Sequence, residues 1–296
     1  MENLRKCILR YGKVLNMLLD GKIVANKKML KIKSEIDTIK DKYKITPKLQ
    51  LIQIGNDPAS TIYANSKIKR GDKLGVDVEL KNFATIDQKS LIDYVKSCNG
   101  RDDIYGIMIE SPLPSGLNFY NTVNNISFYK DSDGMTPYNQ GNLAMKNEMI
   151  APATARAVID IIEYYKVPGN TVCIINRSPV VGRPLSMLLL NRDYTVTLCH
   201  SKTPDIRKIS RESDIVVVAV GISGFLDKDY VKPDSTVIDV GINYSGKKIT
   251  GDANFSVLEN YIENITPVPG GIGIVTATDI FENFLNGLKY QLENKK

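Results

Sequence analysis

The segment from Thr171 to Thr203 constrains the fold most, because it has the pattern of a strand, a turn, a helix and a second strand. Residues 172–175 form a short β-branched run typical of a buried strand, and Pro184 stands where a helix takes its first residue. Residues 185–190 supply the helix body, and residues 195–199 supply the second strand. Two strands joined in this way are expected to be parallel, with a right-handed crossover. The segment therefore predicts an α/β fold built on a parallel sheet.

The turn before this helix is a candidate phosphate site, because the free N–H groups and the dipole at a helix N-terminus favour phosphate oxygens. The turn lacks the Gly-x-Gly-x-x-Gly spacing, so the local pattern leaves dinucleotide binding and an ordinary α/β unit equally open. NAD-binding proteins place an acid after the second strand, whereas this chain has His200, Ser201 and Lys202 there and Arg177 in the turn. These groups suit a ribose 2′-phosphate. NADP is therefore favoured over NAD if a nicotinamide cofactor binds.

Length and composition exclude several other classes of protein. The length of 296 residues predicts about two domains. No apolar run reaches the roughly 18 residues that a membrane span requires, so no membrane partner is expected. The four cysteines are scattered and His200 is the single histidine, so we expect neither disulfides nor a metal site.

The net charge of +6 is concentrated at the N-terminal end, where residues 1–50 carry 13 Lys and Arg against 5 Asp and Glu. Most of these lysines lie opposite the apolar face of a predicted helix between residues 25 and 43, and no aromatic residues interleave with the charges. A solvated helix face is therefore expected, and no nucleic acid partner. Residues 1–16 are basic and have apolar residues at helical spacing, which favours a structural extension or a start codon placed upstream of Met17.

A second predicted helix carries candidate catalytic side chains. It follows the turn at residues 55–60, with Ser60 as the expected N-cap, and it bears Tyr63 and Lys67 on one face. A phenol beside an ammonium can exchange protons or hold a carbonyl. Tyr-x-x-x-Lys also arises by chance, and Tyr244 with Lys248 forms another copy in an expected turn.

Acidic and glycine-rich segments follow several predicted strands. The strand at residues 105–110 precedes Asp131-Ser-Asp-Gly134, which is either a turn or the source of a buried carboxylate. Strand candidates at residues 214–220, 236–240 and 265–268 each end at glycine or asparagine. Loops at the carboxyl ends of parallel strands are the ligand-binding side of a doubly wound sheet.

From about Met17 to the C-terminus, the chain resembles the methylenetetrahydrofolate dehydrogenase/methenyltetrahydrofolate cyclohydrolase family. The matching motifs are, in chain order, Leu19-Asp-Gly-Lys22, Gly55-Asn-Asp-Pro-Ala-Ser60 with Tyr63 and Lys67, Pro112-Leu-Pro114, Asp131-Ser-Asp-Gly134, Arg177-Ser178 with Val181-Gly182-x-Pro184, Cys199-His-Ser201, Asp239-Val-Gly-Ile-Asn243 and Pro267-Val-Pro-Gly-Gly271. Each motif is weak alone, and their number and order carry the resemblance. The order also excludes short-chain dehydrogenases, in which Tyr-x-x-x-Lys lies downstream of the dinucleotide loop.

The resemblance implies an α/β fold of two domains flanking a cleft, the second a Rossmann-type parallel sheet with helices on both faces. Residues 1–136 with 276–296 would form the folate-binding catalytic domain, and residues 137–275 would form the NADP-binding domain. The implied activities are NADP-dependent oxidation of 5,10-methylenetetrahydrofolate to the methenyl compound and hydrolysis of that product to 10-formyltetrahydrofolate. The resemblance also implies a cytoplasmic homodimer.

Residue roles follow from the same resemblance. The implied catalytic residues are Lys67, Tyr63, Glu110 and Asp133. The implied NADP-binding residues are Asn176, Arg177, Ser178, Ser201, Lys202 and Ile242. The implied substrate-binding residues are Tyr63, Lys67, Ile109, Glu110, Ser111, Asp133, Pro269, Gly270, Gly271, Ile272 and Gly273. No metal ligand is implied.

Several positions depart from the family pattern: Ala155 and Ala157 replace a proline and a glycine, and Ile274-Val275 replace a Pro-Met pair. Asn176 replaces the usual glycine of the turn, and asparagine tolerates unusual backbone angles better than most residues. Glu110 replaces the usual glutamine; a carboxylate within reach of Lys67 would favour the charged ammonium and make it a poorer base. The sequence thus leaves open a dehydrogenase with weak or absent cyclohydrolase activity, or one that uses NAD. It also leaves open a catalytically silent cofactor-binding protein.

Overall fold

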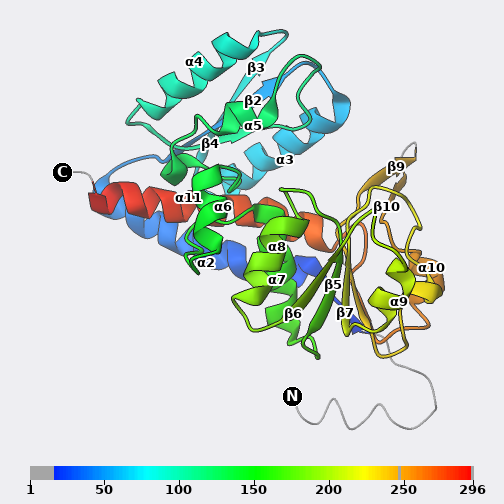
Figure 1. Cartoon of the computed structure of the whole chain (residues 1–296). Coiled ribbons are helices and arrows are strands. Elements are labelled where there is room, and N and C mark those ends of the chain that lie inside the picture. Colours follow the sequence, from blue (N-terminus) through cyan, green and yellow to red (C-terminus); the bar gives the residue numbers. More distant parts are fainter. Residues whose placement is uncertain (1–16, 246–247, 295–296) are drawn as a thin grey trace. The chain divides into compact units, whose positions relative to one another are not determined.

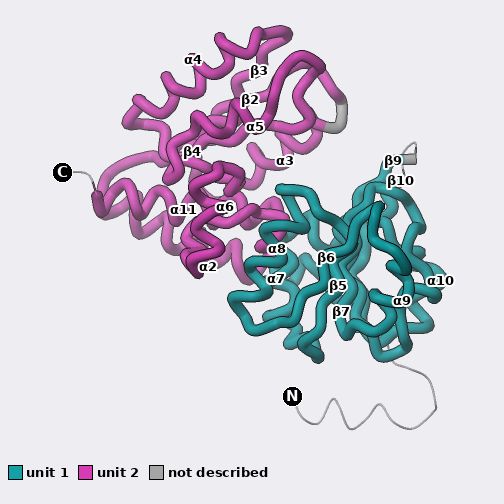
Figure 2. The backbone as a smooth tube through the Cα atoms, in the orientation of Figure 1, with its two compact units in different colours: residues 1–24, 157–275 teal, residues 25–156, 276–296 magenta. Residues whose placement is uncertain are grey.

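The computed structural model describes residues 17–245 and 248–294, which form two compact units (Figure 2). Unit 1 comprises residues 1–24 and 157–275, and unit 2 comprises residues 25–156 and 276–296. This division assigns residues 1–24 and 137–156 differently from the domain limits expected from sequence. The expected basic extension at residues 1–16 lies outside the described residues.

Unit 1 is built on a parallel sheet, which confirms the predicted α/β class (Figure 1). The strand order is β1 (Met17–Leu18), β11 (Asn264–Ile265), β8 (Thr236–Asp239), β7 (Ile215–Val218), β5 (Thr171–Ile175) and β6 (Thr195–Cys199), and each neighbouring pair is parallel. The predicted strand–helix–strand unit is confirmed, since α8 (Gly182–Leu190) joins β5 to β6. A short antiparallel hairpin, β9 (Asn243–Ser245) with β10 (Lys248–Thr250), follows β8.

Helices cover both faces of this sheet. Figure 1 shows α7 (Ala153–Tyr165) and α8 on one side, and α9 (Ile206–Arg211) and α10 (Phe255–Leu258) on the other. The short 3-10 helix η2 (Lys228–Tyr230) packs near α9. Strands β7 and β8 are buried at every residue, as expected for a parallel sheet enclosed between helices.

Unit 2 contains a smaller parallel sheet in the order β3 (Asp77–Phe83), β2 (Lys48–Ile54) and β4 (Ile104–Ile109). The crossover helices are α3 (Pro58–Leu74) and α4 (Gln88–Asn99). The remaining elements are α2 (Gly21–Tyr43), α5 (Phe119–Val123), η1 (Phe128–Lys130), α6 (Pro137–Leu143) and α11 (Ile272–Asn294). The core of unit 2 combines Leu49 and Leu51 of β2 with Phe281, Phe284 and Leu288 of α11.

Helix α3 begins one turn earlier than the expected cap at Ser60. The N-cap is Asp57, whose carboxylate accepts hydrogen bonds from the backbone N–H and the hydroxyl of Ser60 at 2.8 and 2.9 Å. Pro58 suits the first helical position because it has no N–H to leave unsatisfied there. The expectation that Ser60 is the cap is therefore wrong, although the helix itself is present.

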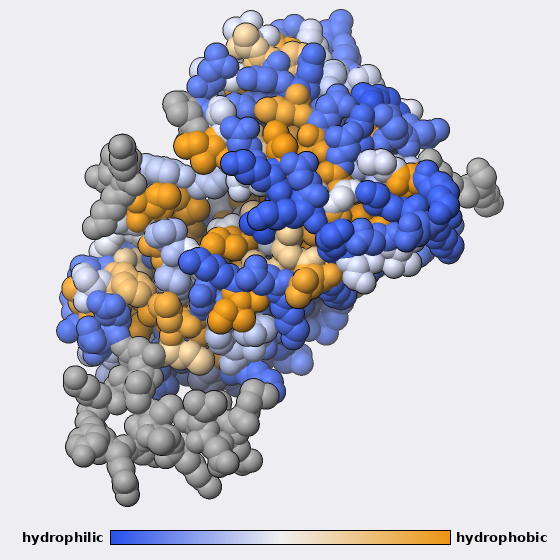
Figure 3. Space-filling model, turned by 180° about the vertical axis from the view of Figure 1, so that it is seen from behind, coloured by the Kyte–Doolittle hydropathy of each residue, from blue (hydrophilic) through white to orange (hydrophobic). Residues whose placement is uncertain are grey.

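The surface is largely hydrophilic on the face drawn in Figure 3, where apolar side chains emerge in separate places. Among residues 17–245 and 248–294, no helix combines the length and the apolar content that crossing a bilayer requires.

Candidate functional site

Lys67 and Glu110 form a buried ion pair in unit 2. Lys67 lies on α3, and its Nζ donates to Oε1 of Glu110 at 2.6 Å, with side-chain exposures of 8% and 6%. The backbone N–H of Glu110 donates to the carbonyl of Ile52 at 2.8 Å, which holds Glu110 directly after β4. Removing one member of such a pair leaves the other charge buried and uncompensated. The pair is therefore a fixed feature of this sheet edge.

Tyr63 stands one turn before Lys67 on α3, as the four-residue spacing predicts. The Lys67 ammonium lies 5.9 Å from the centroid of the Tyr63 ring, and Tyr63 is 39% exposed. The Tyr63 side chain is thus accessible to a ligand, whereas the Lys67 side chain is covered. Of the neighbouring residues expected to bind substrate, Ile109 is buried in β4 and Ser111 is exposed.

The two acids of the Asp131–Gly134 segment have different surroundings. The Asp131 carboxylate accepts backbone N–H groups from Gly134, Met135 and Thr136 at 3.0, 3.1 and 2.7 Å, and the Asn139 amide at 2.9 Å. Both of its oxygens are therefore occupied in stabilising the turn. The turn interpretation holds for Asp131.

Asp133 is the acid of this segment that belongs with the ion pair. Burial, followed by the charge of Asp131, raises the pKa of Asp133 to about 7. The Lys67 ammonium opposes this shift and the Glu110 carboxylate adds to it, so both charges act on Asp133. The structure brings Lys67, Tyr63, Glu110 and Asp133 together within unit 2.

Gln53, on the neighbouring strand β2, was not expected at this site. It follows Ile52, the partner of Ile109, and so comes level with Glu110. Its Nε2 donates to the Thr61 hydroxyl at 3.0 Å, and its buried Oε1 has no hydrogen-bond partner among the described residues. Gln53 and Gln50 are the two buried glutamines of β2, and a glutamine among buried apolar residues is the sequence signal for such a group.

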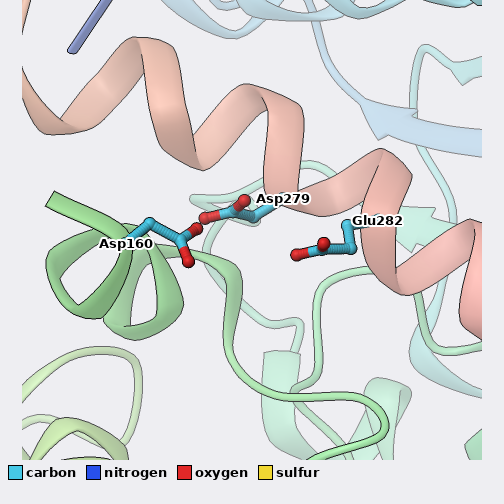
Figure 4. A group of neighbouring side chains, drawn as sticks. All are labelled: Asp160, Asp279 and Glu282. Carbon is cyan, nitrogen blue, oxygen red and sulfur yellow. The ribbon is translucent and has the colours of Figure 1, made fainter. Parts of the chain in front are cut away.

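Two further carboxylates of unit 2, Asp279 and Glu282, project from α11 (Figure 4). Lys28 of α2 donates to both of them, to Glu282 at 2.6 Å. These ion pairs tie α2 to α11. Asp160, also drawn in Figure 4, belongs to unit 1.

In unit 1, Asn176 organises the turn between β5 and α8. Its Oδ1 accepts the backbone N–H groups of Ser178 and Gly182 at 2.7 and 3.0 Å, and its Nδ2 donates to the Ala219 carbonyl at 2.5 Å. A Cβ on Gly182 would overlap the carbonyl of Asn176, so only glycine allows this approach. The backbone of Asn176 does not have a positive φ. The expectation that asparagine stands here because it tolerates such a backbone angle is therefore wrong. Its side chain is what shapes the turn.

The remaining residues expected to bind NADP lie at the same edge of the sheet. Ile175 and Cys199 are paired at the ends of β5 and β6, so the loops with Arg177 and with Ser201 and Lys202 begin side by side. Arg177, Ser201 and Lys202 are exposed. Val181, the residue before α8, makes no side-chain cap, but the Gly182 N–H donates to Asn176 Oδ1 and the Arg183 N–H donates to the Ser178 carbonyl at 3.1 Å. Positive charge and hydroxyl donors are available beside the start of α8.

A pair of buried acids holds the loops after β7 and β8. Asp239 accepts three backbone N–H groups at 2.8 to 3.0 Å, and burial raises its pKa to about 6. Asp252, which the sequence did not single out, accepts the N–H groups of Val220 and Gly221 at 2.5 and 2.9 Å. These bonds fix the loop that presents Ile242, which is 40% exposed.

The glycine loop at residues 269–273 closes against the start of α2. The Gly21 N–H donates to the Gly270 carbonyl at 2.9 Å, and a Cβ on Gly21 would overlap Gly271. A Cβ on Gly273 would lie 3.5 Å from the Ile242 side chain. Gly273 and Ile242, expected to contact different ligands, are thus neighbours in unit 1.

Comparison with known proteins gives two family matches. The model of the tetrahydrofolate dehydrogenase/cyclohydrolase catalytic domain matches residues 19–133, and that of the NAD(P)-binding domain of the same family matches residues 152–292. The bifunctional protein FolD of Picrophilus torridus is 57% identical over 94% of this chain and 100% of its own length.

Solved structures agree with these matches. The bifunctional 5,10-methylenetetrahydrofolate dehydrogenase/cyclohydrolase from Thermoplasma acidophilum is similar with a TM-score of 0.89 and 51% identity, covering 94% of this chain and 100% of that one. The Trypanosoma brucei enzyme, complexed with NADP cofactor and inhibitor, gives a TM-score of 0.88 and 32% identity, covering 94% and 98%.

Proposed function

Because the chain belongs to the tetrahydrofolate dehydrogenase/cyclohydrolase family, we propose that it oxidises 5,10-methylenetetrahydrofolate with NADP and hydrolyses the methenyl product to 10-formyltetrahydrofolate. The chain matches both family domains and spans the full length of a bifunctional relative. Neither the enzyme without cyclohydrolase activity nor the silent cofactor-binding protein is favoured. The buried Lys67–Glu110 pair beside Asp133 is the observation that carries the catalytic part of the proposal.

The cofactor is NADP, held by unit 1. The turn between β5 and α8 would lie against the phosphates, with Asn176 and Ser178 fixing its shape. Arg177, Ser201 and Lys202 would hold the ribose 2′-phosphate by charge and hydrogen bonding. When bound, NADP supplies the acceptor for the hydride.

The dehydrogenase step requires no proton transfer by a side chain of the protein. Hydride leaves a carbon bonded to two folate nitrogens, whose lone pairs stabilise the cation that remains. The chain therefore has to orient the folate rather than move a proton. Tyr63 would pack on the folate, and the Asp133 carboxylate would accept two hydrogen bonds from the amino-pyrimidinone edge of the pterin. The exposed Ser111 would add to the substrate site of unit 2.

The hydrolytic step does need a proton acceptor, because a water molecule must lose a proton as it attacks the methenyl carbon. Lys67 and Glu110 are the charged side chains that we assign to this step. Both belong to unit 2, which we take as the folate-binding unit.

We also propose that the protein is a cytoplasmic homodimer, and this part rests on the resemblance to the family alone. Light scattering after size-exclusion chromatography measures the oligomeric state directly, and a monomeric mass would remove this part.

One experiment tests the two activities separately. NADPH formation from 5,10-methylenetetrahydrofolate reports the dehydrogenase, and loss of methenyltetrahydrofolate absorbance reports the hydrolase. We expect both in the native protein, and we expect Lys67→Met to abolish hydrolysis while hydride transfer remains measurable. Absence of NADPH formation with both NADP and NAD would overturn the proposal.

A further inference from the structure

The geometry of the ion pair decides which of its two members can accept a proton. Lys67 Nζ donates to Glu110 Oε1 at 2.6 Å, and both side chains are more than nine-tenths covered. In this charge-assisted bond the nitrogen is the donor and the carboxylate oxygen is the acceptor. An ammonium has three donors and no lone pair, so it cannot take a proton from water. The carboxylate is the basic member of this pair.

One oxygen of Glu110 is free to act. Oε1 receives the Lys67 bond, while Oε2 has no hydrogen-bond partner within residues 17–245 and 248–294. The ionisable groups around the pair are Tyr63 on the same helix and the two acids of the following loop. Asp131 has both oxygens engaged by turn donors, and Asp133 is assigned to the pterin edge.

We propose that Glu110 is the general base of the hydrolytic step and that Lys67 remains protonated as its charged partner. This inference rests on the proposed cyclohydrolase function. It assigns the proton transfer to a carboxylate instead of an amine.

Hydrolysis of the methenyl cation consumes one water molecule. As the water oxygen bonds to the methenyl carbon, one O–H bond breaks and the proton passes to Glu110 Oε2. The carbon–N5 bond then breaks, and N5 takes that proton back from Glu110. The hydroxyl proton leaves to solvent as the formyl carbonyl forms, so one proton is released overall. The Lys67 ammonium can donate to the oxygen while it changes from hydroxyl to carbonyl.

The pH profile of hydrolysis distinguishes the two possible bases. Carboxylates and amines in model peptides titrate in separate pH ranges, near pH 4.3 for glutamate and near pH 10.4 for lysine. In Glu110→Gln, the amide keeps the shape of the side chain and removes its basicity. The rising limb of kcat for hydrolysis should therefore move upward by about one pH unit or more, and kcat at pH 7 should fall by roughly 10²-fold or more.

Two other variants keep the test decisive. Glu110→Asp retains a carboxylate, so we expect a lower kcat with the rising limb at the native pH. Glu79→Gln is the matched control, because Glu79 also pairs with a lysine, Lys48 at 2.9 Å, in the same sheet but away from the site. It should show the native profile for both activities.

Hydride transfer in the same samples separates failure of the inference from failure of the proposed function. We expect Glu110→Gln to lower kcat for hydrolysis much more than kcat for NADPH formation, because hydride transfer needs no base. A native pH profile of hydrolysis in Glu110→Gln would overturn the role of Glu110 while leaving the proposed function intact. An equal loss of both activities in Glu110→Gln and Glu110→Asp would overturn it too, because a base acts in only one of the two steps.

Discussion

The raised pKa of Asp133 results from its burial and from the charged groups around it. The same four-residue segment contains Asp131, whose oxygens are saturated by backbone donors, and Asp133, whose pKa is raised to about 7. The sequence predicted a turn or a buried carboxylate, and the structure contains both. The sequence could not predict which of the two acids stabilises the turn. That depends on an isolated β-bridge between Ile107 and Asp131, which are distant in the chain.

The raised pKa of Asp133 predicts that folate binding depends on pH around neutrality. Only the carboxylate can accept both hydrogen bonds from the pterin, and the carboxylate fraction falls as the pH drops through about 7. The Kd for tetrahydrofolate should therefore rise below that pH and level off above it. Calorimetric titration across this range measures the effect.

Asp133→Asn provides the control for this prediction. It removes the charge-assisted bonds, worth about 1.5–3 kcal/mol each, so affinity should fall by roughly 10-fold or more and lose its pH dependence. An unchanged Kd for the native protein on both sides of neutrality would contradict the assignment of Asp133.

Gly182 supports a second prediction at this scale. A Cβ at this position would overlap the Asn176 carbonyl, and the Asn176 side chain holds the N–H groups of Ser178 and of Gly182 itself. We expect Gly182→Ala to weaken NADP binding strongly and to destabilise the protein by about 1–3 kcal/mol, as overpacking does.

Thermal unfolding with and without NADP measures both effects. Gly141→Ala is the matched control, since a Cβ there meets no atom within 4 Å and alanine favours the helix. A normal NADP-induced rise in Tm for Gly182→Ala would show that the turn can adapt.

At the scale of single elements, helices and strands were predicted more accurately than their ends. The strand expected at residues 265–268 ends at Ile265. The Thr266 hydroxyl instead accepts the Asp239 N–H at 2.8 Å, and Pro267 has no N–H to continue the ladder. The proline was visible in the sequence, whereas the partner of Thr266 depends on strand order.

Helix α4 shows how a distant side chain can end an element. The buried Lys130 ammonium donates to the carbonyls of Cys98, Asn99 and Arg101 at 3.4, 2.8 and 2.9 Å, at and just beyond the helix C-terminus. Lysine near a helix C-terminus satisfies the last carbonyls and complements the dipole. Nothing local to α4 indicated this partner.

Replacing Lys130 by methionine should therefore destabilise unit 2. The change leaves buried carbonyls without a donor, and hydrogen bonds to charged groups are worth about 1.5–3 kcal/mol. Urea unfolding followed by circular dichroism measures the loss. Lys33→Met, which removes only an exposed pair with Asp37 at 2.8 Å, should cost about 0.5 kcal/mol or less. Equal midpoints for the two variants would contradict the capping role.

At the scale of the whole molecule, the sequence predicted two α/β parts, and the compact units differ from the expected domains in residues 1–24 and 137–156. The Rossmann-type pattern and the return of the last helix followed from motifs and resemblance. The divisions at residues 24, 156 and 275 depend on which core each segment joins. Residues 17–18 join the sheet of unit 1 through β11, a pairing between opposite ends of the chain.

This division predicts that the two units respond differently to loss of the C-terminal segment. Phe281, Phe284, Leu285 and Leu288 of α11 are buried in the core of unit 2. Burying each such side chain contributes about 1.5–3 kcal/mol, so four of them are comparable to the whole stability of a typical domain. The buried α11 residues that belong to unit 1, Ile272 and Val275, precede the division.

A chain that ends at residue 275 should therefore retain NADP binding and lose tetrahydrofolate binding. Limited proteolysis should cut within residues 25–156 and spare residues 157–275, and NADP should still raise the Tm of the protected part. A chain that ends at residue 294 should behave as the native protein in both respects, because it keeps the four core side chains. Tetrahydrofolate binding by the shorter chain would mean that unit 2 folds without α11, and the assignment of that helix to its core would then have to be withdrawn.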